Sequence, residues 1–175
     1  MPVTPYLDTL LLLMVAAAAI NDLASRRIPN RLLLAGMLGA LVLHLLSPRP
    51  LDALLAALGG AVVGLLIFLP FYLVRGMAAG DVKMMAAVGA FTGPVEAIHI
   101  AILAWCAGGV MALAIIVCKG RMRLALANLW AILRAVLLRL PMAAGAGAGD
   151  GRISAGSMPY GLAIATGTLM VLLGR

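Results

Sequence analysis

Residues 53–74 read ALLAALGGAVVGLLIFLPFYLV, a continuous apolar stretch without a charged side chain. About 20 apolar residues in a helix are enough to cross the hydrocarbon core of a bilayer. The rest of the 175-residue chain has the same character, because 65% of its residues are hydrophobic and its mean hydropathy is +1.15. Soluble domains contain only about 45–50% apolar residues. The sequence therefore predicts an integral membrane protein.

Further apolar runs accompany this stretch and predict an all-α, polytopic helical bundle. The run 82–118 is too long for one span of about 20 residues. Gly93-Pro94 divides it, because proline removes a backbone donor and restricts the residue before it. The length of the chain favours a single membrane-embedded domain, residues 1–175, with about six transmembrane helices. The predicted spans are 5–21, 32–46, 53–74, 82–93, 96–118 and 159–174.

Basic residues between alternate runs predict the orientation of the bundle. Positively charged loops of membrane proteins face the cytoplasm, and the loops after the first, third and fifth spans are the basic ones, so both termini are expected outside. The net charge of +7 fits this pattern better than nucleic-acid binding, because the basic residues are dispersed and have few aromatic neighbours. The first run is expected to be a retained span rather than a signal peptide, since no Lys or Arg precedes it. The basic loop residues are Arg26, Arg27, Arg31, Arg75, Lys83, Lys119, Arg121 and Arg123.

The segment 124–140 is a weaker apolar run with basic residues inside it and at both ends. A spanning helix would carry one basic end to the outer side, whereas an interfacial or re-entrant helix would leave them all in the cytoplasm. We favour an interfacial helix within a cytoplasmic segment, 119–157, and the spanning alternative stays open. Elsewhere, glycines such as Gly59, Gly60 and Gly64 predict close helix packing.

Asp22 and Asp81 stand out because only six residues of the chain are acidic. An ionisable group at the edge of a membrane span is costly and points to function. The predicted topology places both aspartates at the cytoplasmic end of the bundle. Two neighbouring carboxyls cannot easily both ionise, so such a pair holds a shared proton. The ionised member can take a proton from water while the protonated member donates to a scissile carbonyl oxygen.

Small and turn-forming residues surround both aspartates. Gly76-Met77-Ala78-Ala79-Gly80-Asp81-Val82-Lys83 permits close backbone approach beside the second acid. Asp22 is followed by Arg26-Arg27-Ile28-Pro29-Asn30, in which Pro29 and Asn30 end one helix and begin the next. Pro159-Tyr160-Gly161 breaks the chain and starts the last span at the same predicted level.

Together these three elements resemble motifs of the type IV prepilin peptidases, the bacterial branch of the GxGD intramembrane aspartyl proteases. Asp22 with Arg26–Asn30 resembles the first-aspartate motif. Ala78–Lys83 resembles the GxGD motif, with Ala78 in place of its first glycine. Pro159-Tyr160-Gly161 resembles a Pro-Phe-Gly element, and the match in order and spacing covers most of the chain.

The resemblance implies that Asp22 and Asp81 are catalytic. It implies a prepilin or pseudopilin substrate whose short basic leader is removed at the cytoplasmic face of the bacterial inner membrane, with pilus assembly machinery as a further candidate partner. The paired cysteines of larger bifunctional members are missing, so the chain resembles the short, protease-only members of Flp/Tad-type systems, and no methyltransferase activity is expected. Aspartyl chemistry requires no cofactor or metal. The supporting or substrate-binding positions that it implies are Ala78, Gly80, Lys83, Pro29, Asn30, Pro159, Tyr160 and Gly161.

Several of these residues also have purely structural interpretations. Lys83 is a candidate positive-inside anchor, Asp22 a candidate partner of Arg26 four residues later, and Pro159-Tyr160-Gly161 a simple helix start. His44 is expected to be packed or interfacial rather than a ligand.

Two other classes of function remain as alternatives for the whole chain. A small ion-coupled carrier would use the paired carboxylates as a proton relay, although carriers place such acids near mid-membrane and show broken helices in related halves. A non-catalytic assembly subunit of a secretion system would not need the aspartates at all.

Overall fold

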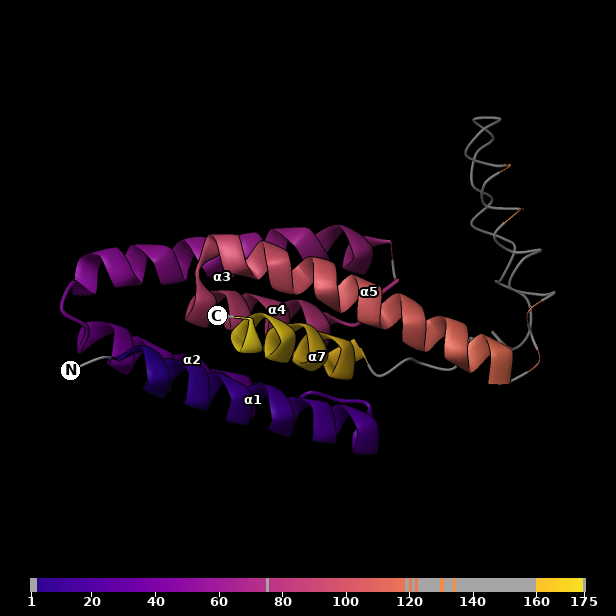
Figure 1. The fold of residues 1–175 in the computed structure, drawn as a ribbon, viewed down its shortest axis with the longest axis horizontal. Helices are drawn as coiled ribbons and strands as arrows, with labels where there is room; N and C mark the ends of the chain where they lie inside the picture. The colour runs from indigo at the N-terminus through magenta and orange to yellow at the C-terminus, as the bar shows by residue number, and fades with distance from the viewer. Residues whose placement is uncertain are drawn as a thin grey trace. The chain divides into compact units, whose positions relative to one another are not determined.

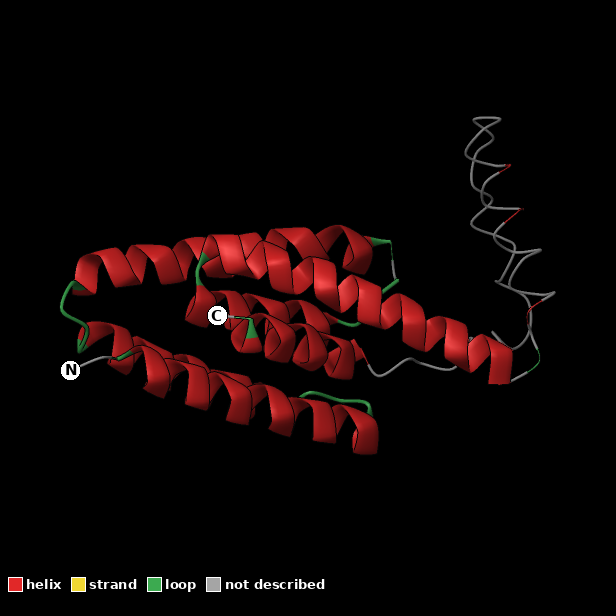
Figure 2. Ribbon diagram, viewed as in Figure 1, coloured by secondary structure: helices red, strands yellow, loops and turns green. Residues whose placement is uncertain are grey.

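The computed structural model of the chain describes residues 3–74, 76–118, 120, 122, 130, 134 and 160–174. Within these residues all regular structure is helical (Figure 2). The predicted interfacial segment, 119–157, lies almost entirely outside the described residues, and Pro159 lies outside them as well. The helices are α1 (Thr4–Ser25), α2 (Asn30–Leu45), α3 (Pro50–Leu73), α4 (Ala79–Thr92), α5 (Pro94–Cys118) and α7 (Tyr160–Leu173).

These helices agree with the predicted spans to within about one helical turn. Among the described helices, α1, α3 and α5 are long and apolar enough to cross a membrane, whereas α2 and α7 are shorter apolar helices. The predicted break lies where expected, because Gly93 ends α4 with φ 85° and Pro94 begins α5. A positive φ is readily adopted only by glycine. The prediction of a helical membrane bundle is confirmed.

Contacts between Cα atoms divide the chain into two compact units, residues 1–108 with 159–175 and residues 109–158. The first unit contains α1 to α4, the beginning of α5, and α7. Both aspartates and the start of α7 belong to it. The candidate site is therefore contained in one unit.

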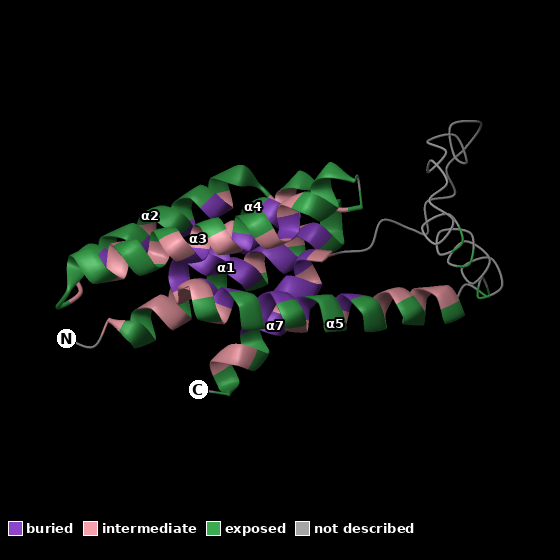
Figure 3. Cartoon of the chain, turned by 90° about the horizontal axis from the view of Figure 1, so that it is seen from above, coloured by how far each residue is buried: buried purple, intermediate pink, exposed green. Residues whose placement is uncertain are grey.

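Helix α4 is the central helix of this unit. It contacts α1, α2, α3 and α7, and nearly all its side chains from Asp81 to Phe91 are buried. By contrast, α2 and α3 carry exposed leucines such as Leu34 and Leu58, and both helices are largely green in Figure 3. This outer apolar surface suits contact with lipid, because lipid tails are as apolar as leucine.

Glycines bring α3 and α4 into backbone contact. A Cβ on Gly60 would overlap the carbonyl oxygen of Gly89, and a Cβ on Gly64 would overlap that of Met85. The predicted role in close packing is confirmed for Gly60 and Gly64. It does not extend to Gly59, whose added Cβ would meet only Pro94 Cγ, at 3.9 Å.

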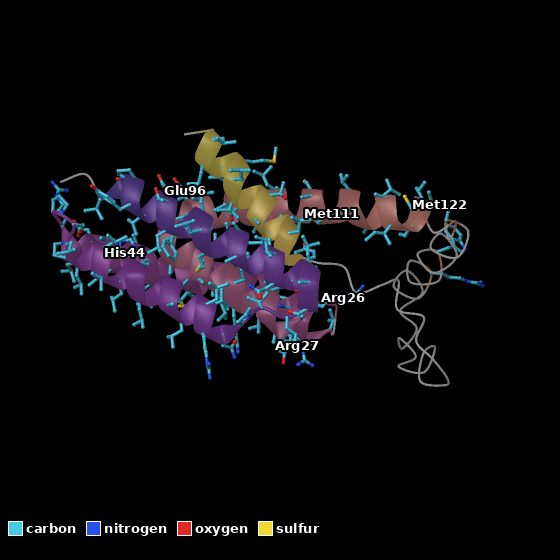
Figure 4. The ribbon with its side chains drawn as sticks, turned by 90° about the horizontal axis from the view of Figure 1, so that it is seen from below. Arg26, Arg27, His44, Glu96, Met111 and Met122 are labelled. Carbon is cyan, nitrogen blue, oxygen red and sulfur yellow. The ribbon has the colours of Figure 1, made fainter. Side chains whose placement is uncertain are left out.

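The helices alternate in direction, so that α1 and α3 end where α2, α4 and α7 begin (Figure 1). Arg26 and Arg27 lie toward this end of the unit and His44 toward the other (Figure 4). His44 is buried, with Nε2 3.0 Å from the Ala90 carbonyl oxygen. This confirms the prediction of a packed histidine.

Candidate active site

Asp22 and Asp81 are brought together by the contact between α1 and α4. Asp22 lies in the last turn of α1 and Asp81 in the first turn of α4, and their exposed fractions are only 7% and 6%. Helix α4 is not one of the three long spans. Burial, and then the charge of Asp22, raise the pKa of the Asp81 carboxyl to about 7, against a smaller opposing effect of a hydrogen bond to the Ala78 backbone. The two carboxyls therefore interact as an electrostatic pair.

A left-handed residue ends α1 four residues after Asp22. Arg26 has φ 53° and ψ 33°, and its N–H donates to the carbonyl oxygen of Asp22 at 2.9 Å. Such a conformation ends a helix sharply and is uncommon outside glycine. Pro29 then precedes α2, and its carbonyl accepts the N–H of Leu32 at 3.1 Å. The Arg26–Asn30 motif thus forms the turn that joins α1 to α2.

The backbone before Asp81 needs no glycine at position 78. Ala78 caps α4 with φ −80° and ψ 150°, an extended conformation open to any residue, and its carbonyl accepts the Asp81 N–H at 3.1 Å. A Cβ on Gly80 would lie 3.5 Å from Ile28, an ordinary packing distance. Gly80 therefore packs the start of α4 against the α1–α2 turn.

Helix α7 reaches the pair through its first turn. The Gly161 N–H donates to Oδ2 of Asp22 at 2.8 Å in a buried hydrogen bond. A Cβ on Gly161 would lie 2.9 Å from this oxygen and 3.1 Å from Asp22 Cβ, which is too close without a shift. The first N–H groups of a helix have no partner within it, and a donor of this kind stabilises negative charge on a carboxylate.

Aromatic rings hold the neighbouring residue, Tyr160. The fully buried Phe68 ring meets Tyr160 edge-on, with centroids 5.9 Å apart, and stacks with Trp105 at 6.1 Å. Tyr160 also interacts electrostatically with Asp81. Sequence reasoning missed Phe68 and Trp105, because large apolar residues are common throughout this chain and only tertiary contacts distinguish these two.

Lys83 and Asn30 lie apart from the carboxyls. Lys83 Nζ donates to Asn30 Oδ1 at 3.3 Å in an exposed hydrogen bond between α4 and α2. Because a helix turns about 100° per residue, Lys83, two residues after Asp81, projects from nearly the opposite face of α4. The structure therefore gives this pair a contact between helices rather than a contact with the carboxyls.

The sequence profile described as the type IV leader peptidase family matches residues 9–113. These residues include both aspartates and all of α2, α3 and α4. The chain belongs to the type IV leader peptidase family. Comparisons with curated proteins and with solved structures gave no significant match. The resemblance to prepilin peptidases, noted from the three motifs, is confirmed.

In this leader peptidase the structure gathers Asp22, Asp81, Tyr160 and Gly161 at the shared end of α1, α4 and α7. Two interacting carboxyls that share one proton are able to activate water and to protonate a carbonyl oxygen. Among the described residues, no group of three or more His, Cys, Asp or Glu side chains lies close enough to hold a metal ion.

Proposed function

We propose that the chain is an aspartyl endopeptidase that removes the short basic leader of prepilin or pseudopilin subunits. The observation that supports this most strongly is the pair of buried, interacting carboxyls on α1 and α4, inside the segment that matches the leader peptidase family. A non-catalytic assembly subunit would have no use for two buried acids. The carrier alternative has no observation in its favour, since both acids lie at the ends of their helices.

In the proposed reaction, one carboxylate takes a proton from water while the water oxygen bonds to the scissile carbonyl carbon. The other carboxyl donates its proton to the carbonyl oxygen. Collapse of the tetrahedral intermediate breaks the C–N bond: the amine leaves with the first proton, and the second carboxyl recovers its own proton from the hydroxyl that again becomes a carbonyl. The raised pKa of Asp81 supplies a carboxyl that is still substantially protonated near neutral pH.

The charge distribution supports a cytoplasmic location for this reaction. Arg26, Arg27, Arg31 and Lys83 lie at the same end of the chain's helices as the carboxyls, and basic loop residues favour the cytoplasmic side. The substrate's basic leader would lie in the cytoplasm, and its apolar helix would stay in the bilayer. We place the enzyme in the bacterial inner membrane, as a multi-pass, protease-only member of a Flp/Tad-type system that works beside pilus assembly machinery.

The remaining motif residues receive supporting roles in this proposal. Ala78 and Gly80 shape the start of α4, and Pro29 and Asn30 start α2. Pro159 is proposed to act with Tyr160 and Gly161 at the start of α7. Lys83 is proposed as an anchor of α4 on α2.

Co-expression with a candidate prepilin tests the proposal. Asp22→Asn and Asp81→Asn each remove one ionisable group with almost no change in size. Asp52→Asn is the matched control, because Asp52 is exposed in the first turn of α3, at the opposite end of that helix from the site. We expect unprocessed prepilin with the first two variants and normal processing with the control. Normal processing by both site variants would exclude the proposed function.

A further inference from the structure

The two carboxyls do not have equivalent surroundings. Asp22 accepts the buried Gly161 N–H at 2.8 Å, from the first turn of α7. Asp81 interacts with the Ala78 backbone of its own helix start, but burial and the charge of Asp22 outweigh this interaction and raise its pKa. The start of α7 therefore gives Asp22 a buried N–H donor of the kind that stabilises an ionised carboxylate.

The donor is fixed in place from two directions. Gly161 lies so close to Asp22 that any side chain would collide with the carboxylate. Tyr160, the residue before it, packs edge-on against the buried ring of Phe68. The N–H also lies at the positive end of the α7 dipole, which favours a negative charge within the first turn.

Other titratable groups belong to the elements around Asp22. Asp81 faces it from α4, and Tyr160 belongs to α7 and interacts with Asp81. Arg26 lies four residues after Asp22 in the chain, and its backbone N–H donates to the Asp22 carbonyl oxygen. Lys83 on α4 donates a hydrogen bond to Asn30.

We infer that the start of α7 divides the work of the pair: Asp22 is the general base, Asp81 is the general acid, and Gly161 is the positioning residue that fixes these roles. This inference rests on the proposed peptidase function. Asp22 takes the proton from water as the water oxygen bonds to the carbonyl carbon, and Asp81 protonates the carbonyl oxygen. When the C–N bond breaks, Asp22 returns its proton to the leaving amine and Asp81 recovers its own from the carbonyl-derived hydroxyl.

Two substitutions of Gly161 separate the effect of losing the N–H from the effect of adding a side chain. Gly161→Ala and Gly161→Pro both add a Cβ beside Asp22, but only proline removes the N–H, and proline is tolerated in the first turn of a helix. Without the donor the base is protonated more readily. The acid limb of the pH profile for leader removal should therefore lie about one pH unit higher for Gly161→Pro than for Gly161→Ala. Coincident profiles would overturn the inference.

A measurement on the unaltered enzyme tests the same inference without requiring either variant to fold. Dicyclohexylcarbodiimide adds to protonated carboxyls in apolar surroundings, forming a stable N-acylurea that mass spectrometry locates. At pH 6 we expect more label on Asp81 than on Asp22, because the Gly161 N–H stabilises the ionised form of the Asp22 carboxyl. Equal labelling, or more label on Asp22, would overturn the division of roles. Such a labelling result would leave the peptidase proposal intact. That proposal fails instead if Asp22→Asn and Asp81→Asn still process the substrate.

Discussion

The contact between α3 and α4 is predicted to control both stability and the position of Asp81. Gly60→Ala places a Cβ against the Gly89 carbonyl and 2.8 Å from the Gly93 carbonyl carbon, where only backbone atoms are available to move. Gly59→Ala makes the same chemical change one residue earlier, with only an ordinary contact to Pro94 at 3.9 Å. The two variants therefore differ in packing alone.

The magnitude follows from two opposing effects. Replacing glycine by alanine inside a helix stabilises the folded state by about 0.5–1 kcal/mol at either position. Overpacking at Gly60 opposes this with about 1–3 kcal/mol, since α4 must move away from α3. The free energy of unfolding of Gly60→Ala should therefore be about 1–3 kcal/mol lower than that of Gly59→Ala. For a chain of this size, this lowers the midpoint of thermal unfolding by about 5 °C. Because α4 carries Asp81, a shift of about 1 Å is also expected to slow leader removal by up to about 100-fold.

Thermal unfolding of the two purified variants in the same detergent, followed by circular dichroism, measures the difference in stability. Processing of a co-expressed prepilin measures the displacement of Asp81. If Gly60→Ala were as stable and as active as Gly59→Ala, the account of α3–α4 packing would be wrong.

Three further predictions concern single groups. The rate of leader removal should fall above about pH 7, because the raised pKa of Asp81 means that it loses its donor proton there; a rate that climbs steadily to pH 9 would contradict this. His44→Leu should lower the free energy of unfolding in detergent by about 1–2 kcal/mol, because it leaves the buried Ala90 carbonyl without its partner, and unchanged stability would refute that role. Lys83→Gln should change stability by less than about 0.5 kcal/mol and keep activity, because its bond to Asn30 is exposed and faces away from Asp81; lost processing would place Lys83 at the site instead.

Much of the helical framework could be predicted from the sequence because the bilayer demands long apolar helices with satisfied backbones. The break at Gly93-Pro94 follows from local backbone chemistry. Gly60 and Gly64 predicted close helix packing, but only the structure shows that α4 is the partner of α3. The two aspartates could be assigned to one end of the bundle, since the alternation of basic loops orders the helices without any knowledge of tertiary contacts.

The details that shape the site could not be predicted in this way. The hydrogen bond from Gly161 to Asp22 uses a backbone N–H, which every residue except proline possesses, so no residue type marks it. Phe68 becomes significant only because its ring meets that of Tyr160 on α7. Lys83 adjoins Asp81 in sequence, yet the helical rotation turns it toward Asn30. Each of these depends on how helices pack, not on local pattern.

Cleavage by the purified enzyme in liposomes tests the central claim, that Asp22 and Asp81 form one catalytic pair, most directly. A synthetic prepilin peptide serves as substrate, mass spectrometry identifies the products, and Asp52→Asn is the control. We predict that Asp22→Asn and Asp81→Asn each reduce the single-turnover rate by about 10²–10⁴-fold or more, while Asp52→Asn cleaves like the unaltered enzyme. A rate near that of the unaltered enzyme in either site variant would contradict the claim.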